Sequence, residues 1–223
     1  MTVIIGDTQT KKAEMDNRKY EVFLGYHQTF WSYLNSYQKA FDILIEDIEK
    51  NDLYVDRIAY PMLFMVRHSL ELGFKANIRY FQTYSEKNDL ANSDSHNLKK
   101  LFEGFKIHIK ETIKNLKTKY SIEVEKEDIK EFNHYCNEVE KLTNEFEILD
   151  NGSFSFRYPI DKSNNKVFNT NDKINLLDVK ELFDKAMTLL FHTQDVFSKY
   201  IDYANMIEES YEQEMRSNYE NYH

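Results

Sequence analysis

The sequence predicts an all-α protein, an antiparallel bundle of about five helices. The chain of 223 residues contains only five Gly and two Pro, whereas all-β and Rossmann folds use many turn-forming residues. Apolar side chains recur at helical spacing through long segments that are joined by short connections. A hydrophobic fraction of 41% suffices for one sizeable core, so we expect a single helical domain over 1–223.

The first two helices are expected over 17–49 and 56–84. In the first, large apolar residues from Phe23 to Ile48 follow a period near 3.6 residues. The second contains the apolar run YPMLFMVRHSLELGFKANIRY at 60–80. Both patterns are typical of helices that bury one face in a core.

The third and fourth helices are expected over 96–119 and 126–149. Polar NDLANSDS separates the third helix from the second, and Asp94 or Ser95 is a suitable N-cap for it. In the fourth, apolar residues at helical spacing begin at Ile129.

The segment 150–175 has a different pattern and is expected to form a small β-hairpin or an ordered loop. Phe154, Phe156 and Tyr158 alternate with a period of two, which is typical of a strand. The sequence SNNK then suits a turn before a returning strand over 166–169.

The last helix is expected over 177–213, because Asp178 and Glu181 resemble a capping box. The two ends of the chain, 1–16 and 214–223, are expected to be a flexible N-terminus and a frayed tail.

Composition excludes several classes of protein. A net charge of −9 argues against a surface built to coat nucleic acid. The single Cys136 cannot form an internal disulfide, and neither a signal peptide nor a membrane span is recognisable, so a cytoplasmic protein is expected. Zinc-ligand spacing, phosphate-binding glycine loops and a Ser/His/Asp order are all missing, and we therefore expect no metal and no cofactor.

Lysines form a row along the third helix. Lys106, Lys110, Lys114 and Lys117 follow steps of four, four and three residues and therefore share one face. Such a row is either an ordinary solvated face or a surface that binds phosphate.

Four polar residues interrupt the apolar run of the second helix. On a helical wheel Arg67 and Glu71 fall inside or beside the apolar stripe, while His68 and Lys75 lie on its rim. Arg67 and Glu71 are either a buried structural ion pair or part of a polar cleft that also contains His68 and Lys75. The cleft would suit phosphate chemistry, because His handles protons near neutral pH and Arg binds the anion.

Two distant residues are candidates for the same site. His96 begins the third helix and is either a capping residue or an anion ligand. About fifteen residues of helix, roughly 22 Å, separate Arg67 from the end of the second helix, which makes His96 the least expected member. Arg157, between anchoring aromatics, either faces solvent and a ligand or points inward toward Glu71.

Four short motifs resemble those of bacterial HEPN-like helical proteins: YPMLF at 60–64, RHSLEL at 67–72, HNL at 96–98 and FRYPID at 156–161. The resemblance covers about residues 20–210. It implies a compact all-α bundle, usually a homodimer. It also implies either a ribonuclease of toxin–antitoxin or anti-phage systems or a non-catalytic relative.

The chain departs from the HEPN nuclease signature, in which several residues separate an Arg from a following His. Arg67 and His68 are adjacent, and only Arg216 and His223, at the end of the chain, have the required spacing. The standard nuclease pair is therefore in doubt.

Three functions follow from these residues. The first is a HEPN-like, metal-independent ribonuclease or phosphate-directed enzyme of bacterial defence. In it His68 or His96 would handle protons, Arg67 and Arg157 would stabilise phosphate charge, and Glu71 would orient the cluster. Its substrate-binding residues would be Lys75, His96, Lys106 and Lys110.

The second is a non-catalytic homodimeric module that recognises a nucleotide, RNA or a defence-system protein. The third is a structural interaction protein. A homodimer is expected in addition because YHQTFWSYL at 26–34 places aromatic residues on more than one helical face.

Overall fold

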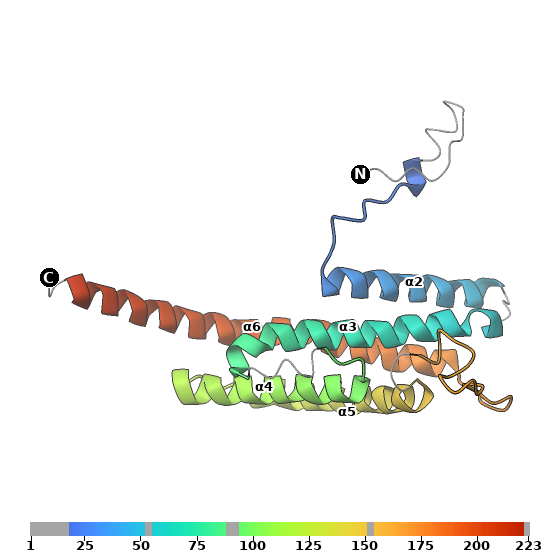
Figure 1. The fold of residues 1–223 in the computed structure, drawn as a ribbon. Helices are drawn as coiled ribbons and strands as arrows, with labels where there is room; N and C mark the ends of the chain where they lie inside the picture. The colour runs from blue at the N-terminus through green and yellow to red at the C-terminus, as the bar shows by residue number, and fades with distance from the viewer. Residues whose placement is uncertain (1–17, 52–54, 88–93, 151–153, 221–223) are drawn as a thin grey trace.

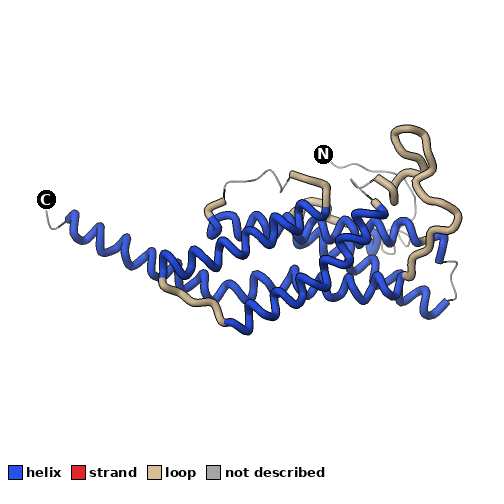
Figure 2. The backbone as a smooth tube through the Cα atoms, turned by 90° about the horizontal axis from the view of Figure 1, so that it is seen from below, coloured by secondary structure: helices blue, strands red, loops and turns tan. Residues whose placement is uncertain are grey.

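The computed structural model describes residues 18–51, 55–87, 94–150 and 154–220 (Figure 1). The all-α prediction is confirmed, since the described residues contain helices and loops but no strand (Figure 2). The α-helices are α2 (Phe30–Asn51), α3 (Ala59–Ser85), α4 (Leu98–Tyr120), α5 (Lys126–Leu149) and α6 (Leu176–Glu220). Two short 3₁₀ helices, η1 (Arg18–Tyr20) and η2 (Val55–Arg57), precede α2 and α3. Among the described helices, none combines the length and apolar character that crossing a bilayer requires.

Helix α3 lies at the centre of the bundle, against α2, α4 and α6 (Figure 1). Its central residues are buried on nearly all sides, which explains why its sequence is so continuously apolar. The last turns of α6 extend beyond the other helices (Figure 1).

Helices α3 and α4 run in the same direction, so the bundle is not antiparallel throughout. The start of α4 lies beside the middle of α3, where His96 contacts Glu71, and its last turns lie beside the end of α3, where Asn115 donates to Tyr84 O. His96 thus lies beside the middle of α3 and not beside its end. The other consecutive pairs are antiparallel, as α2 with α3 and α5 with α6.

Glycine at position 73 allows α3 to approach two neighbours closely. A Cβ atom there would lie 2.5 Å from Leu190 Cδ1 of α6 and 2.9 Å from Leu34 Cδ1 of α2, both of which are fully buried. One turn further on, Asn77 Nδ2 donates to Leu190 O at 3.0 Å and thus ties α3 to α6 at this point.

The expected first helix begins later than predicted. Residues 21–29 are not helical, and α2 starts after Thr29, whose Oγ1 accepts a hydrogen bond from Ser32 N at 3.1 Å. This N-cap fixes the helix start. At the other end, the expected frayed tail is helical as far as Glu220. The ends 1–17 and 221–223 lie outside the described residues.

The predicted β-hairpin is not supported, and the described part of 150–175 is an ordered loop. It contains a single antiparallel bridge between Ile160 and Lys166. Between them the Asp161 side chain accepts hydrogen bonds from Ser163 N at 2.8 Å and Asn165 N at 2.9 Å. A side-chain turn thus replaces the ladder that two strands would need.

We predict that Gly73→Ala destabilises the protein. Overpacking a filled core costs about 1–3 kcal/mol, and the better helix propensity of Ala returns up to about 1 kcal/mol. A net loss of about 1–2 kcal/mol should appear in urea denaturation. Gly25→Ala is the control, because no atom lies within 4 Å of a Cβ at that position. A Gly73→Ala protein as stable as the parent would disprove the close packing.

Candidate functional site

Five polar residues from three parts of the chain meet at the middle of α3, and we name them the α3 cluster: Arg67, Glu71, Lys75, His96 and Asp150. Three come from successive turns of α3, one lies two residues before α4, and one ends α5.

The guanidinium of Arg67 is fully buried and satisfied by protein groups. Its Nη1 lies 3.1 Å from Glu71 Oε2, and its Nη2 donates to His96 O at 2.6 Å. Its Nε donates to Asp150 O at 3.4 Å and lies 3.1 Å from Asp150 Oδ2, without a hydrogen bond to that carboxylate oxygen. The expected burial and contact of Arg67 and Glu71 are thus observed. Because Arg67 is fully buried, a phosphate at the surface cannot reach its guanidinium.

Glu71 shares its other oxygen between two groups nearer the surface. Its Oε1 accepts hydrogen bonds from Lys75 Nζ at 2.9 Å and contacts His96 Nδ1 at 2.8 Å. Burial by itself would raise the pKa of Glu71, but the hydrogen bonds and charges of Lys75 and His96 outweigh it, and the pKa lies below its usual value. Glu71 is therefore an ionised buried carboxylate at neutral pH.

His96 is the exposed end of this network, with 67% of its side chain accessible to solvent. Its Nδ1 is held by Glu71, whereas its Nε2 makes no hydrogen bond to the described residues. The N-cap of α4 is Asn97, whose Oδ1 accepts from Lys100 N at 2.8 Å, so His96 is not the capping residue. His96, the least expected member of the site, does reach Glu71, because α4 runs parallel to α3.

His68 lies beside the cluster between aromatic rings. It stacks on Phe64 with centroids 5.4 Å apart and meets Tyr37 edge-on at 4.9 Å. Burial lowers its pKa, Glu71 opposes this effect, and Arg67 and Lys75 lower the pKa further. At neutral pH this imidazole is neutral.

Arg157 lies on the same side of the bundle as His68. Its guanidinium is 6.0 Å from the centroid of Phe64, the ring on which His68 stacks, and its charge also lowers the pKa of His68. The rings of Phe154 and Tyr158, each 5.7 Å away, flank it as well. The inward alternative is not observed, since Arg157 is exposed.

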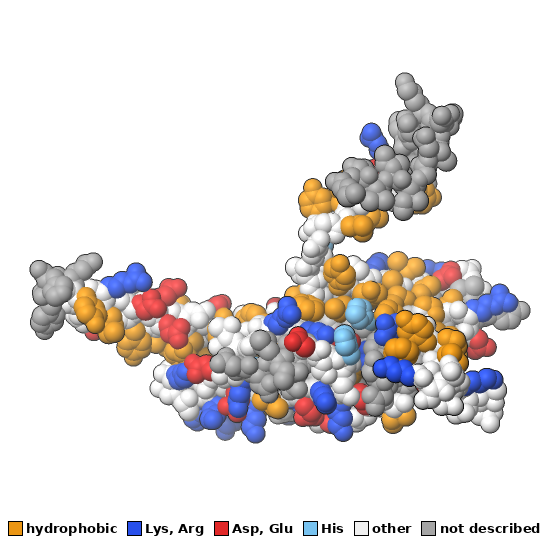
Figure 3. All heavy atoms as spheres, in the orientation of Figure 1, with side chains coloured by type: hydrophobic (Ala, Val, Ile, Leu, Met, Phe, Trp, Pro, Cys, Tyr) orange, Lys and Arg blue, Asp and Glu red, His pale blue; other side chains and the backbone are white. Residues whose placement is uncertain are grey.

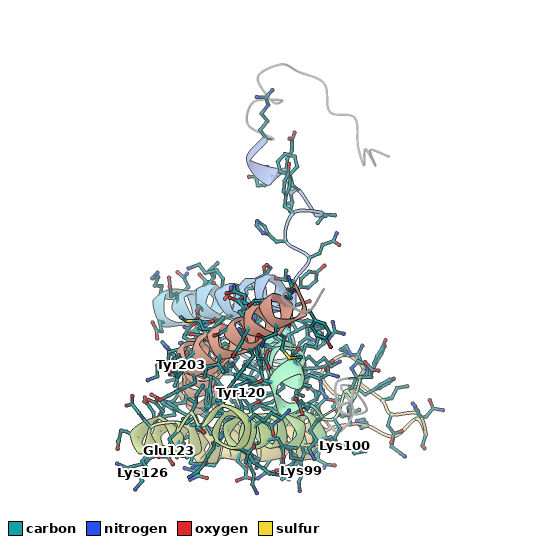
Figure 4. The ribbon with its side chains drawn as sticks, turned by 90° about the vertical axis from the view of Figure 1, so that its left-hand side faces the viewer. Lys99, Lys100, Tyr120, Glu123, Lys126 and Tyr203 are labelled. Carbon is teal, nitrogen blue, oxygen red and sulfur yellow. The ribbon has the colours of Figure 1, made fainter. Side chains whose placement is uncertain are left out.

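The lysine row does not join the site. Lys106 pairs with Glu103 at 2.8 Å and with Glu140 of α5 at 3.7 Å, so it faces away from the α3 cluster. Lys110 is exposed and makes no contact with the cluster. The neighbouring Lys99 and Lys100 also point outward from α4 (Figure 4). The row therefore lies apart from the α3 cluster, and Lys106 and Lys110, two of the expected substrate-binding residues, do not join it.

The Arg216–His223 alternative has no support in the described residues. Arg216 lies on the exposed end of α6 and pairs with Glu212 at 3.5 Å, and His223 lies outside the described part of the chain.

Asp150 is a member of the α3 cluster that the sequence did not predict. This residue ends α5, and its Oδ1 accepts hydrogen bonds from the backbone N–H groups of Phe154 and Ser155. An Asp at the start of DNGSF is a local signal for such a turn. Nothing in the spacing, however, connects it with a guanidinium 83 residues earlier.

The described residues hold no group of three or more His, Cys, Asp or Glu side chains arranged to bind a metal ion. Comparison with protein-family models, curated proteins and solved structures found no match for this chain.

We predict that Glu71→Gln lowers the free energy of unfolding by about 3–5 kcal/mol, because it removes one of the two carboxylates that compensate the buried charge of Arg67. Chemical denaturation measures the loss. Glu127→Gln is the matched control: its pair with Lys130 is exposed on both sides and contributes at most about 1 kcal/mol. Equal stability of the two variants would contradict the burial of the pair.

His68 should make stability depend on pH. Its folded pKa lies below the ordinary value of 6.5, so the unfolded chain binds the proton more readily. Stability should therefore fall as pH falls from 6.5 toward the folded pKa, and His68→Gln should remove this component. His134→Gln, exposed on α5, is the control. Urea denaturation at a series of pH values tests it, and an unchanged profile in His68→Gln would refute it.

Proposed function

We propose that the surface around His96 is the active site of a metal-independent ribonuclease. The observation that supports this function best is the Glu71–His96 pair, in which a buried carboxylate holds Nδ1 of an exposed imidazole at 2.8 Å. A carboxylate in this position fixes the tautomer that leaves Nε2 unprotonated and able to accept a proton. His96, rather than His68, is therefore the proposed general base.

The surroundings of the pair favour an anionic substrate. Lys75 lies next to the carboxylate with 12% of its side chain exposed, and Arg157 lies nearby across Phe64. Histidine, Lys and Arg side chains gather on this face of the bundle (Figure 3). Lys75 and Arg157 are the proposed phosphate partners, while Arg67 positions Glu71 from inside.

RNA is the proposed substrate because its 2′-hydroxyl supplies a nucleophile next to each phosphate. His96 Nε2 takes the proton of that hydroxyl, and the 2′-oxygen attacks the adjacent phosphorus. The P–O5′ bond then breaks, and the leaving oxygen takes up a proton from water. The products are a 2′,3′-cyclic phosphate and a free 5′-hydroxyl.

The resemblance to HEPN-like proteins suggests the biological setting, bacterial defence against phage or stress. The runner-up function is a non-catalytic module of the same fold that binds RNA, a nucleotide or a defence-system protein. It is favoured by the complete burial of Arg67, which removes this guanidinium from the surface.

We predict that the protein cleaves RNA equally with and without EDTA and that His96→Gln slows cleavage about 10²–10⁴-fold, the usual contribution of a general base. RNA with 2′-O-methyl groups should resist cleavage. Because His96 is exposed, thermal melts of His96→Gln should match the parent. His134→Gln is the activity control.

Full activity of His96→Gln would eliminate this residue as the base. Tight RNA binding without turnover in the parent protein would instead favour the binding module.

A further inference from the structure

Large apolar side chains are concentrated in a segment that stands away from the bundle, and we name residues 20–26 the arm (Figures 1, 3 and 4). Its exposed apolar residues are Tyr20 at 73%, Val22 at 75%, Phe23 at 73%, Leu24 at 84% and Tyr26 at 75%. So many exposed apolar residues in one short segment mark an interaction surface.

An apolar groove lies where the arm joins the bundle, and we name it the α2–α3 groove. Its volume is about 590 Å³, within the usual range of ligand pockets. Leu72 and Ala76 of α3 form part of its lining together with the aromatic rings of Trp31, Tyr33 and Tyr80. The groove thus offers an apolar contact surface for the arm, whose large side chains are exposed.

We propose that the arm of one copy of this chain packs into the α2–α3 groove of a second copy, in a reciprocal exchange. Gln28 and Thr29, which connect the arm to α2, line the groove themselves. A two-fold axis near this rim would therefore place both arms in both grooves at once. Such an exchange closes as a dimer and leaves neither arm exposed.

Charges support this pairing. Arg79 lines the groove, and the arm carries Glu21, which is exposed. An acidic residue of one copy would therefore meet a basic residue of the other.

The chain's own arm is not the occupant we propose. Thr29 is fixed by its hydrogen bonds to Ser32, at 2.8 Å between hydroxyls and 3.1 Å to the backbone N–H, and the chain leaves the bundle from there. Returning to its own groove would require a reversal within Gln28 and Thr29. Gly25 has no neighbouring atom within 4 Å of a Cβ position, so this part of the arm is not packed on its own bundle.

The exchange would also extend the candidate site. His68 lines the groove and lies beside the α3 cluster, so the arm of the second copy would cover one edge of the proposed active site. The contact itself does not depend on the proposed chemistry. Mass measurements test it, whereas RNA cleavage by His96→Gln tests the ribonuclease.

The first experiment measures mass by light scattering at micromolar concentration. The parent should be a dimer, and the double variant Phe23→Asp/Leu24→Asp should be a monomer. Trp31, the only tryptophan of the chain, lines the groove, and its emission should shift to longer wavelength in the double variant. Ile148→Asp, at a position 79% exposed on α5, is the control and should remain dimeric.

The second experiment tests which segments meet. Leu24→Cys and Tyr33→Cys proteins, when mixed and oxidised, should form a disulfide-linked heterodimer, while the native Cys136 is buried and unreactive. A monomeric parent would overturn the exchange, and so would a dimer that survives the double Asp substitution. It would also be overturned if the disulfide formed only within one chain, which a variant carrying both Leu24→Cys and Tyr33→Cys would reveal.

Discussion

The buried charge of Arg67 constrains the arrangement of the helices around α3. A guanidinium without access to water must receive its partners from the protein, and here they come from α3, from His96 two residues before α4 and from the residue that ends α5. The position of His96 beside α3 and the position of the α5 terminus are therefore coupled to one side chain. Removing any of these partners would leave a charge or a carbonyl unsatisfied in the core.

The same network connects buried residues that support the fold with exposed residues that are proposed to react. Glu71 uses one oxygen to compensate Arg67 in the interior and the other to hold Lys75 and His96 toward the surface. Only the outer members reach solvent, so a ligand can meet them without disturbing the buried pair. This division explains why Arg67, which has the most suggestive side chain in the sequence, serves as a support, while the exposed imidazole is the better candidate for proton transfer.

Helix α3 also connects two surfaces. On one side of His68 lie Glu71 and its partners, and on the other lies the α2–α3 groove. Both are built on a helix whose close contacts with α2 and α6 depend on Gly73. A rigid central helix of this kind holds polar groups in place more firmly than a loop does. Arg157 is the exception, because it reaches the site from a loop and is held by aromatic rings.

The sequence by itself determined the helical class, most helix boundaries and the burial of Arg67 and Glu71, because these properties follow from a local period of 3.6 residues. Only the tertiary structure decided that α4 runs parallel to α3, that His96 reaches Glu71 and that Asp150 completes the environment of Arg67. Those contacts depend on the direction in which each helix runs relative to its neighbour. The hydrophobic period of the sequence carries no information about that direction. Local side-chain hydrogen bonds decided the rest: Thr29 sets the start of α2, and Asp161 forms a turn where alternation had predicted a strand.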